Sequence, residues 1–127
     1  MFENSTILYL EDEPLIAMDT GDHLEDLGFS RVDIAYRLAS AQKLVEKHTF
    51  DFALLDINVD GGQTSLDLGR RLAKGGTTVI FASGNSGAGR DLRAEGFSFL
   101  DKPFALSDLT DHLAAMVAFK AERRTGS

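Results

Sequence analysis

Five short, mainly apolar runs recur along the chain, at residues 7–10, 32–35, 52–55, 79–82 and 97–100. Runs of this length are typical of parallel strands that helices cover on both faces. Between the runs, apolar residues return at the spacing of an amphipathic helix. This alternation predicts an α/β fold, namely a doubly wound, five-stranded parallel sheet of the flavodoxin-like (βα)5 type. Its crossover connections are expected to be right-handed.

The ends of most helices follow from proline, glycine and capping residues. Pro14 suits the first turn of the first helix, and Gly28 suits its end. Thr64 or Ser65 can cap the third helix, which the glycine pair at residues 75–76 ends. The apolar faces of the second and last helices are predicted over residues 38–45 and about 106–117.

The fourth helix is expected to be weak or short. Residues 84–96 contain four glycines, which leaves only residues 90–95 with a helical pattern. A helix of under two turns is unstable unless tertiary packing supports it. We therefore predict a mobile segment between the fourth and fifth strands.

The length and composition of the chain limit the classes of protein to which it can belong. The 127 residues suffice for one domain, with a predicted core over about residues 5–120 and a frayed tail over 121–127. The net charge of −7 argues against direct nucleic-acid binding. The absence of cysteine excludes disulfides and thiolate metal sites. No apolar run is long enough to cross a membrane, and no signal peptide is evident, so a cytoplasmic location is expected.

Polar residues end four of the five strands. The first ends at Glu11 and Asp12, the third at Asp56, the fourth at Ser83 and the fifth before Lys102. Each residue alone is common in loops or at helix starts. A doubly wound sheet, however, gathers the carboxyl ends of its strands at one edge, where ligands bind. The joint placement therefore predicts a functional site centred on Asp56.

The chemistry of these groups favours phosphoryl transfer. Three carboxylates at one edge repel one another unless a cation lies between them, and hard oxygen ligands suit Mg²⁺. With the metal bound, Asp56 can attack a phosphoryl group. Lys102 offers a compact positive charge to a phosphoryl oxygen, and Ser83 offers a hydroxyl.

Four stretches carry a resemblance to a known family: Leu10-Glu11-Asp12-Glu13-Pro14, Leu55-Asp56-Ile57-Asn58, Ser83, and Asp101-Lys102-Pro103-Phe104. With these, the chain resembles the receiver domain of bacterial two-component response regulators over about residues 5–120. The resemblance implies that Asp56 is the phosphoacceptor and that Glu11, Asp12, Asp56 and the Asn58 backbone carbonyl bind Mg²⁺. It also implies that Ser83 is the switch hydroxyl and Phe99 the switch aromatic, that Lys102 contacts the phosphoryl group, and that the Lys102–Pro103 bond is cis.

By the same resemblance the chain is a stand-alone signalling module rather than an enzyme, beyond self-catalysed phosphorylation and dephosphorylation. The phosphoryl donor would be a sensor histidine kinase or a histidine phosphotransfer protein. Output would pass through contacts with a downstream protein that the sequence does not identify, or the domain would act as a phosphate sink. Neither nucleic acid nor a membrane is an expected partner.

Three departures from the family pattern accompany the resemblance. Glu11 stands where the family often has Asp, and Phe99 stands where it often has Tyr. The stretch at residues 81–84, Phe-Ala-Ser-Gly, is similar to a receiver subgroup marked by Phe-Ala-Thr-Gly, with Ser83 here in place of Thr. In that subgroup the fourth helix is often poorly formed, which agrees with the glycine-rich pattern.

Two other function classes remain open from the residues alone. A phosphohydrolase of the haloacid-dehalogenase type would use Asp56 as nucleophile, but its second carboxylate is replaced by Asn58. A flavodoxin-type binding domain needs a phosphate-binding loop after its first strand, and Glu-Asp-Glu at residues 11–13 would repel phosphate without a metal. The three histidines, His23, His48 and His112, are predicted to have surface or boundary roles.

Overall fold

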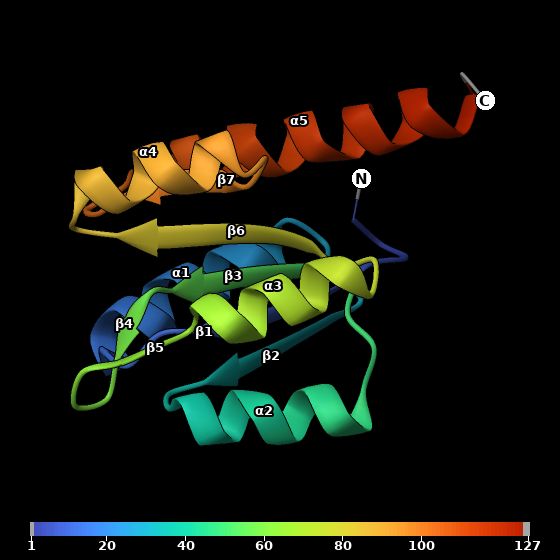
Figure 1. The fold of residues 1–127 in the computed structure, drawn as a ribbon. Coiled ribbons are helices and arrows are strands. Elements are labelled where there is room, and N and C mark those ends of the chain that lie inside the picture. Colours follow the sequence, from blue (N-terminus) through green and yellow to red (C-terminus); the bar gives the residue numbers. More distant parts are fainter. Residues whose placement is uncertain (1, 126–127) are drawn as a thin grey trace.

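The computed structural model describes residues 2–125 and contains a five-stranded parallel sheet in the order β2-β1-β3-β6-β7 (Figure 1). The strands are β1 (Thr6–Leu10), β2 (Arg31–Ala35), β3 (Phe52–Asp56), β6 (Thr78–Ser83) and β7 (Ser98–Asp101). The predicted α/β fold is therefore confirmed. The central strand β3 is buried along its whole length, as its unbroken apolar run requires.

Helices cover both faces of the sheet. The helices are α1 (Pro14–Asp26), α2 (Leu38–Lys47), α3 (Leu66–Lys74), α4 (Ser86–Ala94) and α5 (Leu106–Thr125). Residues of α1 and α5 share one apolar core, and residues of α2, α3 and α4 share the other. In Figure 1, α1 lies behind the sheet and α3 in front of it. The chain thus forms three layers, and the carboxyl ends of all five strands are left at one edge.

The prediction for the fourth helix was wrong at its start. Helix α4 begins at Ser86 and has nine residues, the same length as α3. The Asn85 side chain accepts a hydrogen bond of 3.0 Å from the Gly87 amide and so caps the helix. Such a cap contributes about 1 kcal/mol, comparable to the cost of one glycine within a helix.

The last helix also departs from its predicted end. Helix α5 continues to Thr125, whereas a frayed tail was predicted from residue 121. Residues 120–124 are Lys-Ala-Glu-Arg-Arg, all strong helix formers, which explains the continuation. Residues 126–127 of the predicted tail lie outside the described residues.

A small antiparallel hairpin lies between β3 and α3. It consists of β4 (Asn58–Val59) and β5 (Gln63–Thr64), which the sequence pattern did not predict. Gly61 and Gly62 at its turn have positive φ angles of 70° and 90°. Glycine adopts this backbone region at little cost, so the pair allows the chain to reverse directly after Asp56.

Candidate functional site

Three carboxylates meet at the carboxyl edge of the sheet. Glu11 and Asp12 follow β1, and Asp56 ends the neighbouring strand β3. Each offers an oxygen atom within 4.8 Å of the others. Glu11 and Asp56 are buried, at 2% and 7% exposure, whereas Asp12 is exposed. The sheet therefore presents two partly desolvated acids and one acid that faces solvent.

Lys102 brings the positive charge to this cluster. Its Nζ lies 2.7 Å from Glu11 Oε1 and 3.4 Å from Asp56 Oδ2. The second oxygen of Glu11 accepts a 3.2 Å hydrogen bond from the Glu13 amide. Lys102 follows β7 at the far side of the sheet, and its amide donates to the Ser83 carbonyl. The Lys102–Pro103 peptide bond is cis, as predicted.

The electrostatics of the cluster favour a bound cation. Burial raises the pKa of Asp56, Lys102 opposes the shift, and the charges of Glu11 and Asp12 add to it, so that the pKa is about 6. For Lys102, burial lowers the pKa, but its hydrogen bond to Glu11 and the charges of Asp56 and Glu11 outweigh burial, so its pKa is raised. Lys102 is thus a fixed cation, yet it does not offset the cost of ionising Asp56.

The donor set fits Mg²⁺. All three side chains offer hard carboxylate oxygens, and Asp12 is exposed to solvent, which suits an ion that keeps several water ligands. A divalent cation would lower the pKa of Asp56 by the same mechanism through which Lys102 opposes burial. Asn58 lies two residues beyond Asp56, at the start of β4. Its role as a carbonyl ligand stays a prediction.

The two predicted switch residues lie on β6, which pairs with β3, and on β7, which pairs with β6. Ser83 ends β6 and is 1% exposed, and its hydroxyl accepts a 3.0 Å hydrogen bond from the Asn85 amide. Phe99 lies on β7 with its ring buried. The structure therefore places Glu11, Asp12, Asp56 and Lys102 in one cluster, while Ser83 is bonded to the start of α4 instead.

Sequence reasoning missed two residues that position the acidic loop. Ser65 is completely buried, and its hydroxyl donates a 2.8 Å hydrogen bond to the Asp56 carbonyl. It stands at the predicted cap position of α3 but makes no side-chain cap. Asp60 accepts a hydrogen bond from the Leu38 amide at the start of α2. Both contacts span different elements, so spacing along the chain gives no signal for them.

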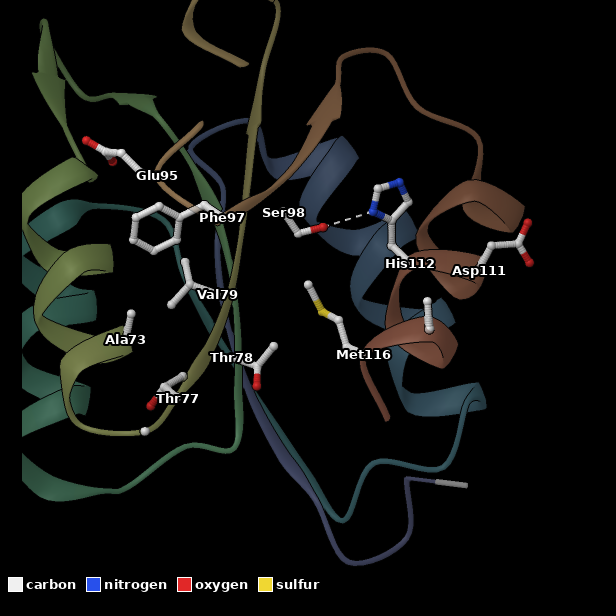
Figure 2. Close-up of a pocket in the computed structure, with 13 residues that line it drawn as sticks. Ala73, Thr77, Thr78, Val79, Glu95, Phe97, Ser98, Asp111, His112 and Met116 are labelled. Carbon is white, nitrogen blue, oxygen red and sulfur yellow. Dashed lines mark hydrogen bonds between the residues drawn. The ribbon is translucent and has the colours of Figure 1, made fainter. Parts of the chain in front are cut away.

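The histidines lie away from this cluster, as predicted, and all three are half-buried. His23 bonds to Thr110, His48 to Arg31, and His112 to Ser98. Figure 2 shows the last pair beside a groove of about 1150 Å³ at the amino-terminal ends of β6 and β7. No residue of the acidic cluster lines this groove, so its size does not bear on the chemistry at Asp56.

The fold and the acidic edge define an α/β domain with a carboxylate cluster at the carboxyl ends of its parallel strands. The family model of the response regulator receiver domain matches residues 7–114. The chain therefore belongs to the response regulator receiver domain family. Receiver domains are signalling domains and in general not enzymes, and the acidic cluster of Glu11, Asp12 and Asp56 fits the phosphorylation site of this family.

Solved structures agree with this assignment. SdrG from Sphingomonas melonis Fr1 is 37% identical, with a TM-score of 0.75 over 92% of this chain and 99% of that chain. A CheY-like receiver domain protein from Methanospirillum hungatei JF-1 has a TM-score of 0.80 at 22% identity, over 94% and 98% of the two chains. Response regulator TrrA from Thermotoga maritima, solved with Mg²⁺ and BeF, has a TM-score of 0.75 at 23% identity, over 87% and 97%.

Two further searches, one among curated proteins and one for membrane-spanning helices, give no positive result. No curated protein sequence matches the chain significantly. Among the described residues, no helix combines the length and apolar character needed to cross a membrane.

Proposed function

We propose that Asp56 accepts a phosphoryl group from a phosphohistidine of a sensor histidine kinase or histidine phosphotransfer protein, with Mg²⁺ at Glu11 and Asp12. The observation that carries the proposal is the cluster itself. A buried carboxylate ends the central strand, two more acids lie within 4.8 Å, and Lys102 Nζ lies 3.4 Å from Asp56 Oδ2. This arrangement joins a nucleophile, a cation site and a fixed positive charge.

The transfer needs no oxidant or further reactant. An oxygen of Asp56 forms a bond to phosphorus while the phosphorus–nitrogen bond of the donor breaks, and the electron pair stays on the leaving imidazole nitrogen. When bound, Mg²⁺ offsets negative charge on the phosphoryl oxygens. Lys102 is placed to contact a second oxygen, because its ammonium group already faces Asp56. The Ser65 hydroxyl holds the Asp56 backbone in place.

Exposed apolar side chains beside the cluster support a protein donor. The first turns of α1 carry Leu15 at 76% exposure and Met18 at 58%, directly after the acidic loop. A protein donor that covers this part of α1 would bury both side chains. Burying these side chains would contribute about 25 cal/mol per Å² of apolar surface to the complex. The transferred group then signals through protein contacts, or the domain acts as a phosphate sink.

Intact-protein mass spectrometry after incubation with Mg²⁺ and acetyl phosphate tests the proposal. We expect one added phosphoryl group in the wild-type protein and none in Asp56→Asn or after chelation of the metal. Asp22→Asn is the matched control, because Asp22 is exposed on α1 and lies outside the cluster. Phosphorylation of Asp56→Asn to the wild-type level would refute the assignment. Repeated turnover of acetyl phosphate would favour the phosphohydrolase alternative.

A further inference from the structure

The hairpin of β4 and β5, which follows Asp56 directly, is fixed at its base. The Ile57 amide donates to the Ala82 carbonyl of β6 at 2.9 Å, and the Ile57 carbonyl accepts from the Ser65 amide at the same distance. The Ser65 hydroxyl adds its bond to the Asp56 carbonyl. Val59 is 2% exposed and belongs to the apolar core on the side of α2 and α3. The hairpin therefore leaves β3 and enters α3 at defined positions.

The turn of the hairpin is tied to α2 instead. Gly61 and Gly62 are exposed, and a Cβ atom added at either would meet no atom within 4 Å. Asp60, the residue before them, is half-buried, and its Oδ1 accepts a 3.3 Å hydrogen bond from the Leu38 amide. In Figure 1 the hairpin extends past the end of β3, on the side where α2 begins. This bond therefore joins the turn to a helix that lies earlier in the chain.

Helix α2 begins without a side-chain cap of its own. Arg37 stands at the cap position and makes no side-chain capping hydrogen bond. The first amides of a helix have no partner within the helix, and they form the positive end of the helix dipole. The Asp60 carboxylate supplies both an acceptor and a negative charge from outside the helix. The place of the turn therefore depends on the start of α2.

We propose that Asp60 is a positioning residue for the metal site. By binding the start of α2 it holds the hairpin in one conformation, and this limits the positions that the Asn58 carbonyl can take. Asn58 begins β4, pairs with Thr64, and lies two residues from both Asp56 and Asp60. The inference rests on the proposed function, because it concerns the affinity of the acidic cluster for Mg²⁺.

A calorimetric titration with Mg²⁺ tests this role. Asp60→Ala removes the acceptor and should weaken Mg²⁺ binding by about ten-fold, as expected when a group that orients a metal ligand is lost. Asp60→Asn keeps a side-chain oxygen and should bind within about two-fold of wild type at about 0.15 M ionic strength, where distant charges are screened. Asp67→Ala is the matched control, because Asp67 is an exposed acid in the first turn of α3. It should change the affinity by less than about two-fold.

The outcomes separate a positioning role from simpler ones. Equal losses in Asp60→Ala and Asp60→Asn would mean that Asp60 acts only through its charge, and would overturn the proposal. An unchanged affinity in Asp60→Ala would mean that the bond serves α2 alone, and would also overturn it. A wild-type protein that does not bind Mg²⁺ would contradict the proposed function, and this inference with it.

Amide hydrogen exchange in the presence of a chelator gives an arm that needs no metal. Asp60→Ala should raise the exchange rates of the hydrogen-bonded amides within residues 58–64 by at least about ten-fold, because the turn loses its bond to α2. Asp60→Asn and Asp67→Ala should leave these rates within about three-fold of wild type. Wild-type rates in Asp60→Ala would show that the hairpin is held without Asp60, and would refute the positioning role.

The coupling between the metal site and α2 is also reciprocal. If Asp60 joins the two, Mg²⁺ should slow exchange of the Leu38 amide in the wild-type protein and in Asp60→Asn, but not in Asp60→Ala. The same slowing in all three proteins would show that the metal reaches α2 without Asp60, and would contradict the proposal. Neither exchange experiment involves a phosphoryl group, so its failure leaves the assignment of Asp56 standing.

Discussion

Replacing Asp56 with Asn should stabilise the metal-free protein at neutral pH. Asp56 is buried beside Glu11 and Asp12, and these surroundings disfavour its charged form. Asparagine has almost the same shape and carries no charge. The substitution therefore removes the cost of a buried negative charge without opening a cavity.

The magnitude follows from the pKa. In the folded protein the pKa of the Asp56 carboxyl is raised from 3.8 to about 6, with the opposing effect of Lys102 included. This difference in pKa lowers the free energy of unfolding by about 3 kcal/mol when Asp56 is charged. Because the folded pKa lies above the unfolded one, the contribution of Asp56 to stability is most favourable below pH 3.8, falls as the pH rises, and is least favourable above about pH 6. At neutral pH the folded protein therefore carries the full cost of the charged Asp56 carboxylate.

Urea denaturation with chelator present measures this difference. Near neutral pH, Asp56→Asn should be more stable than the wild-type protein by about 3 kcal/mol, or roughly 10 °C in Tm. Near pH 4 the two proteins should have about the same free energy of unfolding, because the wild-type carboxyl is then protonated in the folded state. Asp22→Asn, an exposed substitution on α1, should show no such dependence.

Magnesium should narrow the difference in stability between the two proteins. Saturating Mg²⁺ stabilises the wild-type protein, since it binds the folded cluster and offsets the charge of Asp56. The Asn variant should gain less, so its advantage should shrink. An Asp56→Asn protein that is no more stable than wild type in chelator near neutral pH would refute the reasoning. So would an advantage that stays constant between pH 4 and neutral pH.

Three further outcomes follow from the same geometry. In a calorimetric titration, Asp12→Ala should weaken Mg²⁺ binding more than Glu13→Ala, because Asp12 belongs to the cluster and Glu13 does not; the opposite ranking would remove Asp12 from the metal site. Lys102→Ala should still be phosphorylated, but the NMR chemical shifts of amides near Phe99 should then stay nearly unchanged on phosphorylation. Changes as large as in the wild-type protein would show that the signal reaches Phe99 without Lys102. Ser65→Ala should cost about 1–3 kcal/mol in urea denaturation, because it leaves the buried Asp56 carbonyl without its donor; an unchanged midpoint would contradict this.

Much of the fold could be predicted from the sequence because its signals are local. The apolar run before Asp56 is buried on both faces, as its composition indicated. Pro14 begins α1, and Gly76 follows α3 with a φ of 101°. These residues act through their own backbone preferences, so no tertiary information is needed to place them.

The fourth helix shows where local reasoning fails. Its glycines lower helix propensity, and the sequence pattern therefore predicted a segment of under two turns. The capping bond of Asn85 and the packing of Phe99 against Gly89 offset that cost. The second contact joins residues ten positions apart through the fold, which no periodicity reveals.

The residues of the candidate site could be predicted from the sequence, but the contacts between their side chains could not. Strand ends placed Glu11, Asp12, Asp56 and Lys102 at one edge, because parallel strands bring their carboxyl ends together. That Lys102 lies closer to Glu11, at 2.7 Å, than to Asp56, at 3.4 Å, depends on side-chain geometry. The strand-end pattern gives no distances between side chains.

The most direct test of the central claim is the chemical location of the phosphoryl group. Borohydride reduces an aspartyl phosphate to homoserine, so peptide mass spectrometry after reduction identifies the modified residue. After incubation with Mg²⁺ and acetyl phosphate, we expect homoserine at position 56 and unmodified Asp12. Homoserine at any other aspartate, or none at position 56 while the intact protein carries a phosphoryl group, would contradict the assignment of Asp56 as the phosphoacceptor.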